Sequence, residues 1–276
     1  MVRTRLPWGL KVYKWDAKEY SKNSHNQKRW AEGLLSQIRF RGDETVLDIG
    51  CGDGKISCRI SELVPRGKVL GIDSSREMIR HARDTFKGRH NNLFFQKKDA
   101  CRLGFKNKFD VIFSNACFHW IADHDSLLNS AGQALKPGGG LVVQMGAKGN
   151  IAGVIKAGDK LRRRKKWRGY FKGFTSPYHF SDPAAFTALL KRHGFKIRAM
   201  RTFVRYMEYT NAADFRDSLR TIWMPYSHRA PERLREEFLA ETIAQYLKEH
   251  PAGKKGGIRV KMKRLEFYAE EINDHY

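Results

Sequence analysis

Two acidic residues flank a glycine loop near the start of the chain. Asp48 precedes the loop Gly50-Cys-Gly-Asp-Gly54, and Asp73 ends the next apolar run. Such a loop between a strand and a helix is typical of dinucleotide sites, but Lys55 stands where the third glycine of G-x-G-x-x-G belongs. A carboxylate at position 48 would repel a pyrophosphate and attract a cation. Asp73 can accept hydrogen bonds from the hydroxyls of an unphosphorylated ribose. The pattern favours S-adenosylmethionine, which carries an ammonium, a sulfonium and no phosphate.

Further polar residues follow the third and fourth apolar runs. We expect Asp99 to meet the adenine amino group, and 114–116 to lie beside the reacting methyl. Each acid could also have a simpler structural role, as a partner of a helix dipole, a helix cap or a solvated loop acid. Their joint arrangement at strand ends favours a ligand site. The candidate cofactor-binding residues are Asp48, Gly50, Cys51, Gly52, Asp73, Ser74, Met78, Asp99, Ala100, Ser114, Asn115 and Ala116.

The spacing of apolar residues predicts the elements that position these groups. Up to residue 145, strands of about five residues alternate with amphipathic helices, which predicts an α/β, doubly wound parallel sheet with helices on both faces. The expected strands here are 45–49, 68–73, 93–96, 109–114 and 141–145, with helices at 55–64, 78–86 and 127–135. After residue 146 we expect a helix at 183–193, a strand at 195–209, helices at 212–223 and 231–248 and a final strand at 259–269. The last two helices would form a lid inserted before the last strand.

The bulk composition limits the remaining classes. No apolar run approaches the roughly 18 residues that a membrane-spanning helix needs, so no membrane span is expected. The first residues lack the apolar region of a secretory signal, so we expect a cytoplasmic location. The cysteines form no C-x-x-C pair and no Cys/His metal spacing, so we expect reduced thiols and no metal; they are Cys51, Cys58, Cys101 and Cys117.

The chain is strongly basic, with 53 Lys and Arg against 29 Asp and Glu and a net charge of +24. Segment 160–172 interleaves cations with Trp167, Tyr170 and Phe171. This composition suits a nucleic-acid backbone with stacked bases, a polyanionic small substrate or an acidic carrier protein. A solvated basic helix explains it equally well, so the alternatives stay open.

Several runs resemble the class I methyltransferases, most closely the branch that contains trans-aconitate methyltransferase and juvenile hormone acid methyltransferase. They are VLDIGCGDGKIS, GKVLGIDSSREMI, KKDA, FDVIFSNACFHWI and LKPGGGLVVQM. The resemblance implies a Rossmann-like, mostly parallel seven-stranded sheet in one methyltransferase domain over 1–276. Within it, 1–40 would be a helical cover, 41–150 the cofactor-binding core, and 151–276 the basic segment, the end of the sheet and the substrate-covering helices.

The resemblance also indicates residues for the methyl acceptor. Gln27 is similar to a glutamine that contacts a substrate carboxylate, and Trp120 matches a tryptophan that shares that task. Both are neutral donors, which orient a carboxylate without quenching its nucleophilicity. Alternatively, Trp120 is a core aromatic and Gln27 a solvated helix residue. Tyr178 and Trp223 are further candidates for the acceptor pocket.

His119 bears on the kind of acceptor. A carboxylate is ionised at neutral pH and needs no general base, whereas a phenol or an ammonium acceptor would need one, and His119 follows the fourth strand. The histidine can equally position a loop or touch the cofactor. We therefore expect carboxyl O-methylation of a small acid, with S-adenosylhomocysteine as product; a carrier-protein thioester or RNA as acceptor is the alternative. The sequence does not indicate an oligomeric state.

Overall fold

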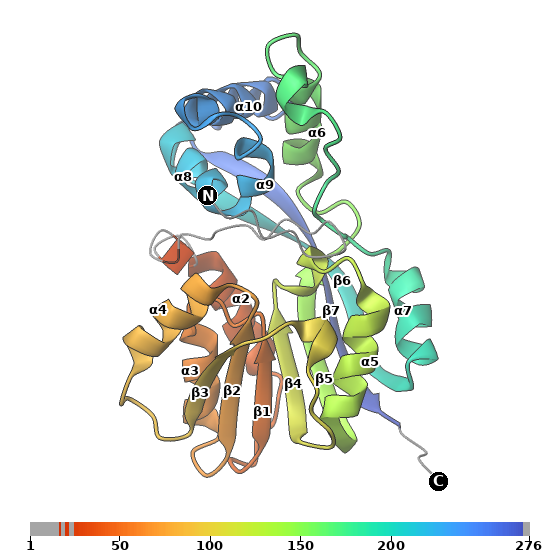
Figure 1. Ribbon diagram of the computed structural model, residues 1–276. Helices are drawn as coiled ribbons and strands as arrows, with labels where there is room; N and C mark the ends of the chain where they lie inside the picture. Colours follow the sequence, from red (N-terminus) through yellow and green to blue (C-terminus); the bar gives the residue numbers. More distant parts are fainter. Residues whose placement is uncertain (1–16, 18–19, 22–24, 273–276) are drawn as a thin grey trace.

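The computed structural model describes residue 17, residues 20–21 and residues 25–272, which form a seven-stranded sheet (Figure 1). The strands lie in the order β3-β2-β1-β4-β5-β7-β6, with β1 to β5 parallel and β7 antiparallel to both neighbours. This confirms the expected mostly parallel, doubly wound sheet. The strands are β1 Thr45–Ile49, β2 Lys68–Asp73, β3 Leu93–Lys97, β4 Phe109–Asn115, β5 Leu135–Gly146, β6 Phe195–Tyr209 and β7 Ile258–Glu271.

Helices cover both faces of the sheet (Figure 1). Buried side chains of α2, α3 and α4 pack on one face, and those of α5 and α7 pack on the other. The central strands are therefore buried on both sides, which explains their continuous apolar runs. The helices are α2 His25–Leu35, α3 Lys55–Leu63, α4 Arg76–Phe86, α5 His124–Ala134 and α7 Pro183–Arg192, with short turns at Ala100–Arg102 and Phe118–Trp120.

A second hydrophobic core lies beyond the sheet. β6 and β7 extend past their neighbours, and their far ends, 207–209 and 258–262, pack against four helices (Figure 1). These helices are α6 Ala152–Arg162, α8 Ala212–Ile222, α9 Met224–Ser227 and α10 Arg235–Glu249, with turns at Arg168–Phe171 and Glu232–Leu234. We call the four helices and the two strand ends the lid. Three of its helices are inserted between β6 and β7.

Local chemistry fixes where several helices begin. The Ser75 hydroxyl accepts a hydrogen bond from the Met78 N–H and caps α4, Asp182 caps α7 before Pro183, and Asn211 caps α8. Ser75, and not its neighbour Ser74, is thus the cap of α4.

Two expected boundaries differ most from the structure. The strand expected at 141–145 begins at Leu135, directly after α5, because Phe109 of β4 already pairs with Leu135 there. Lys136, Pro137 and the three glycines therefore lie inside β5. The helix expected from 231 begins as a short turn, and α10 starts only at Arg235. Among the described residues, no helix is long and apolar enough to cross a membrane.

Candidate cofactor and acceptor site

The carboxylate that ends β1 is almost completely buried. Asp48 is 2% exposed, and the Ser57 hydroxyl of α3 donates a hydrogen bond to its Oδ2 at 2.6 Å. Burial raises the pKa of Asp48 to about 7; the nearby charges of Asp73 and Asp53 add to the rise, and the Ser57 bond opposes it. Asp48 is therefore only partly ionised near neutral pH, and a cation bound beside it would favour the ionised form.

Asp73 connects the glycine loop to the start of α4. Its Oδ2 accepts a hydrogen bond from the Gly52 N–H at 3.1 Å, and its Oδ1 accepts one from the Ser75 N–H at 2.8 Å. Burial nevertheless raises the pKa of this carboxyl. The N–H groups of Gly50 and Cys51 donate to the Ile72 carbonyl, so the loop is attached to the end of β2 at a second point.

The protein itself requires a glycine at position 50. Gly50 has a φ of 75°, and a Cβ there would lie 2.4 Å from the Cys117 side chain. Gly52 has a φ of 54° and faces the Tyr20 ring, which a Cβ would meet at an ordinary 3.5 Å. The loop is thus enclosed by Cys117, which follows β4, on one side and by Tyr20 on the other.

The other predicted cofactor residues lie along the same edge of the sheet. Asp99 is exposed and caps the turn after β3, where the Cys101 N–H donates to it at 2.9 Å. Ser114 is buried and donates its hydroxyl to the Ile49 carbonyl, which joins β4 to β1. Asn115 ends β4, and Ala116 follows with a left-handed φ of 57°. Met78 and Ala100 are buried, whereas Ser74 is exposed.

This set of donors and acceptors fits S-adenosylmethionine. The edge offers carboxylates, with Asp48 and Asp73 partly desolvated, and such acids attract a cationic nucleoside and repel a phosphate. Gly52 and Asp73 are already hydrogen-bonded to each other, so the loop is held in place before a ligand arrives.

His119 is buried and held as a neutral ring. Its Nδ1 lies 3.3 Å from the Gly146 nitrogen and accepts that N–H, so the proton of the neutral ring resides on Nε2. Burial lowers the pKa of His119 well below its usual value, and the charge of Arg264 lowers it further. The side chain that was a candidate general base is therefore a hydrogen-bonded part of the sheet edge.

An aromatic column joins the sheet edge to the lid. The ring centroids of Trp120 and Tyr178 are 4.9 Å apart, those of Tyr178 and Trp223 6.0 Å, and those of Trp223 and Tyr226 4.0 Å. The Tyr178 hydroxyl also donates to the Ile222 carbonyl at 2.6 Å. Three of the predicted acceptor residues are thus brought together. The fourth, Gln27, lies on α2, but its side chain is outside the described residues.

The basic segment 160–172 packs against α10. Lys166 pairs with Glu237 and Glu241 at 2.5 and 2.6 Å, and Lys160 pairs with Glu249. Two of the three aromatic rings that the sequence offered for base stacking are instead buried in the lid core: Trp167 is 0% exposed and Phe171 is 5% exposed. Only Tyr170 keeps an exposed ring.

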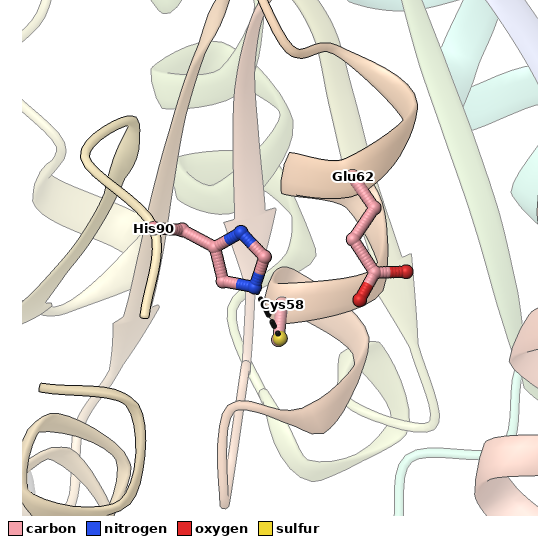
Figure 2. A group of neighbouring side chains, drawn as sticks. All are labelled: Cys58, Glu62 and His90. Atoms are coloured by element: carbon pink, nitrogen blue, oxygen red, sulfur yellow. Dashed lines mark hydrogen bonds between the residues drawn. The ribbon is translucent and has the colours of Figure 1, made fainter. Parts of the chain in front are cut away.

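A further cluster lies away from the strand ends, between α3 and the loop that follows α4. Figure 2 shows Cys58, Glu62 and His90, whose ligand atoms lie within 4.8 Å of one another. The Cys58 Sγ is 3.4 Å from the His90 Nε2, while Glu62 pairs with Arg59. The sequence spacing of the cysteines missed this group because His90 comes from a different element.

Comparison with known proteins agrees with the fold. The family described as "Methyltransferase domain" matches residues 46–139. A trans-aconitate 2-methyltransferase of Azoarcus sp. is 34% identical over 48% of this chain and 50% of its own length. One of Rhizobium leguminosarum is 27% identical over 91% of this chain and 96% of its own. The structure of Haemonchus contortus phosphoethanolamine N-methyltransferase 2 with S-adenosyl-L-methionine superposes with a TM-score of 0.57 and 18% identity, over 93% of this chain and 57% of that one.

Residues 46–139 match a methyltransferase domain, and this match and the relatives indicate an S-adenosylmethionine-dependent methyltransferase of the class I type. Within that class it is similar to the trans-aconitate methyltransferases, some of which it matches over only about half of their length.

Proposed function

We propose that the protein methylates a carboxylate oxygen of a small acidic metabolite. The observation that carries this proposal is the state of His119, which lies at the strand edge as a neutral ring with Nδ1 occupied by the Gly146 N–H. An ammonium or phenol acceptor must lose a proton, whereas a carboxylate arrives ionised. The similarity to trans-aconitate 2-methyltransferases supports the same acceptor class.

The reaction needs no proton transfer. Bound S-adenosylmethionine supplies a methyl group: the carboxylate oxygen bonds to its carbon, the carbon–sulfur bond breaks, and the electron pair stays on sulfur as S-adenosylhomocysteine and a methyl ester form. In this proposal Asp73 binds the ribose hydroxyls, Asp48 attracts the positive charge and Asp99 binds the adenine amino group. Because opposite charges are neutralised, alignment and exclusion of water suffice.

The acceptor would lie beneath the aromatic column. The indole N–H of Trp120 and the amide of Gln27 would orient its reacting carboxylate, with Tyr178 and Trp223 forming the apolar wall. The stacking and the Tyr178 hydrogen bond to Ile222 fix this wall to the lid. Any movement of the lid would therefore also move this wall of the acceptor site.

We propose that the first 40 residues cover the cofactor. Two contacts support this part of the proposal: the Tyr20 ring lies against Gly52, and the Lys55 Nζ donates to the Ser21 carbonyl at 2.6 Å. Residues 41–150 would then bind the cofactor, and 151–276 would complete the sheet and enclose the acceptor.

The basic segment favours a small acid over RNA or a carrier protein. Several of its cations are neutralised by glutamates of α10, and the buried rings of Trp167 and Phe171 cannot stack on bases. A neutralised variant, Arg163→Gln with Lys165→Gln, removes two exposed cations of the segment. It should keep small-acid methylation and would lose activity only on a polyanionic partner.

The test is transfer of labelled methyl from S-adenosylmethionine to a panel of carboxylic acids, acyl carrier protein and total RNA. The expected product is a methyl ester, which releases labelled methanol in alkali. Base-stable label in RNA, or no label in any acid, would refute the proposal.

A further inference from the structure

A buried arginine lies on β7 where the sheet meets the lid. Arg264 is paired in register with Gly146 of β5 and Phe203 of β6, and it is only 2% exposed. Gly146 is the residue whose N–H donates to His119. Arg264 is thus the cross-strand neighbour of the residue that donates a hydrogen bond to His119, and it lies on the proposed acceptor side of the site.

No ion pair among the described residues balances the charge of this guanidinium, and the only acid that acts on it electrostatically is Glu266. Among the described residues, no carboxylate lies within ion-pair distance of Arg264 and its Nε has no hydrogen-bond partner. Its contacts are the Gln144 Oε1, 3.5 Å from Nη2, and the Trp30 ring, whose centroid is 5.1 Å from the guanidinium carbon. Burial lowers the pKa of Arg264 only to about 10, so the side chain remains a cation at neutral pH.

The nearest acid on the same strand is already neutralised. Glu266 forms an ion pair with Arg201 at 2.5 Å, and it accepts hydrogen bonds from Gln144 at 2.9 Å and from Gln37 at 3.4 Å. Together these three residues, Arg264, Glu266 and Arg201, carry one excess positive charge. Because Glu266 is paired with Arg201, the excess charge is that of the buried Arg264. Leaving a buried charge uncompensated costs several kcal/mol in proteins, which points to a partner that arrives with a ligand.

The surrounding elements place this charge beside the acceptor. Trp30, which contacts the guanidinium, is on α2 one turn after Gln27, a residue proposed to orient the reacting carboxylate. Arg264 also interacts electrostatically with His119, since its positive charge lowers the pKa of that histidine. A cation here repels the positive cofactor and attracts an anion.

We propose that Arg264 binds a second, non-reacting anionic group of the methyl acceptor, so that the preferred substrates are di- or tricarboxylates. A guanidinium forms strong two-point hydrogen bonds with carboxylates, which would quench a reacting oxygen but suit a group that only anchors the molecule. The neutral donors Trp120 and Gln27 would then serve the reacting carboxylate. The inference rests on the proposed carboxyl methylation and adds to it the charge that selects the acid.

A purely structural role makes a different prediction. If Arg264 only fastened α2 to β7 through Trp30, its replacement would lower stability and would affect all acceptors equally. Trp30→Leu removes that contact and keeps the charge, so it separates the two roles.

The experiment compares Arg264→Met and Arg264→Lys with Arg259→Met, which removes an exposed charge from the same strand. Calorimetry measures the binding of trans-aconitate to each protein saturated with S-adenosylhomocysteine. Labelled-methyl assays compare kcat and KM for trans-aconitate and for the monocarboxylate trans-2-butenoate. We expect Arg264→Met to weaken trans-aconitate binding about 100-fold, the effect of losing one buried charge pair. Arg264→Lys keeps the charge but not the two-point hydrogen bonding, so it should restore only part of the binding, and Arg259→Met should change the binding of neither acid.

The outcomes are distinguishable. Equal losses for both acids, or trans-aconitate binding that survives in Arg264→Met, would overturn the inference. The inference would also be overturned if the wild-type enzyme methylated a monocarboxylate but bound no di- or tricarboxylate at 10-fold the KM of that monocarboxylate. That result would leave the proposed function standing. Binding that depends on Arg264 without any methyl transfer would support the anion site and count against the proposed function. If Arg264→Met does not fold, Arg264→Lys and Trp30→Leu decide: trans-aconitate binding weakened by the lysine variant and kept by Trp30→Leu supports the inference, and any other pattern refutes it.

Discussion

The carboxyl of Asp48 makes stability and cofactor binding depend on pH in opposite directions. Its pKa of about 7 in the folded protein, against 3.8 for a free side chain, is a rise of about three units, or about 4 kcal/mol. The folded state holds this proton more tightly than the unfolded chain does. The ionised form therefore destabilises the protein progressively as pH rises from about 4 to about 7, and fully above that range.

Replacing Asp48 by Asn keeps a neutral acceptor for the Ser57 hydroxyl and removes the ionisation. We expect Asp48→Asn to be more stable than the wild type by about 2 kcal/mol at pH 5 and about 4 kcal/mol at pH 8. Urea unfolding of the ligand-free proteins across this range measures the difference. A difference that does not change with pH would refute the buried, partly ionised carboxyl. Ser61→Ala is a suitable control, since it removes a hydroxyl from the same helix that bonds only to the Cys58 carbonyl.

The same ionisation should govern cofactor affinity. A positive ligand favours ionised Asp48, so wild-type affinity for S-adenosylmethionine should rise up to about tenfold per unit between pH 5.5 and 7. The asparagine variant should bind more weakly and lack this slope. Calorimetry at several pH values checks it, and a wild-type slope retained in Asp48→Asn would exclude this carboxyl as its source.

Four further variants test the remaining roles. Asp73→Ala removes the acceptor of the Gly52 and Ser75 N–H groups, so affinity for S-adenosylmethionine should fall by about 100-fold or more in calorimetry; wild-type affinity would remove Asp73 from the site. Trp120→Phe, and likewise Gln27→Ala, should lower kcat for the true acid and spare cofactor affinity, and unchanged kinetics would exclude them. His119→Asn should lower kcat by about tenfold at most and should leave the pH profile of kcat unchanged. A pH dependence that is present in the wild type and lost in the variant would restore His119 as a base.

The cofactor side of the molecule was predictable because its determinants are local. Asp48, the glycine loop and Asp73 lie within one strand–helix–strand unit of about 30 residues, and parallel pairing of β1 with β2 brings their ends together. The register of strand pairing and the helix caps then set only the exact positions of these residues. For that reason the alternation of strands and helices was enough to predict the sheet, including the lid before the last strand.

Boundaries and surface roles were less predictable because they depend on packing. Pro137 and three glycines are typical of a helix end and a loop, yet pairing with β4 holds this stretch in strand form from Leu135. The cations and rings of 160–172 look alike in sequence, but α10 supplies acids to the cations while the lid core takes Trp167 and Phe171. Neither result follows from the segment alone.

The proposed acceptor side shows the same limit more sharply. His119, Trp30 and Arg264 come from three elements separated by about 90 and about 145 residues, and only the antiparallel register of β7 with β5 places Arg264 opposite Gly146. No motif contains Arg264, so its charge was not among the sequence candidates. A shift of one residue in that register would turn Arg264 to the opposite face of the sheet, leaving the cofactor loop unchanged and removing the positive charge from the acceptor side.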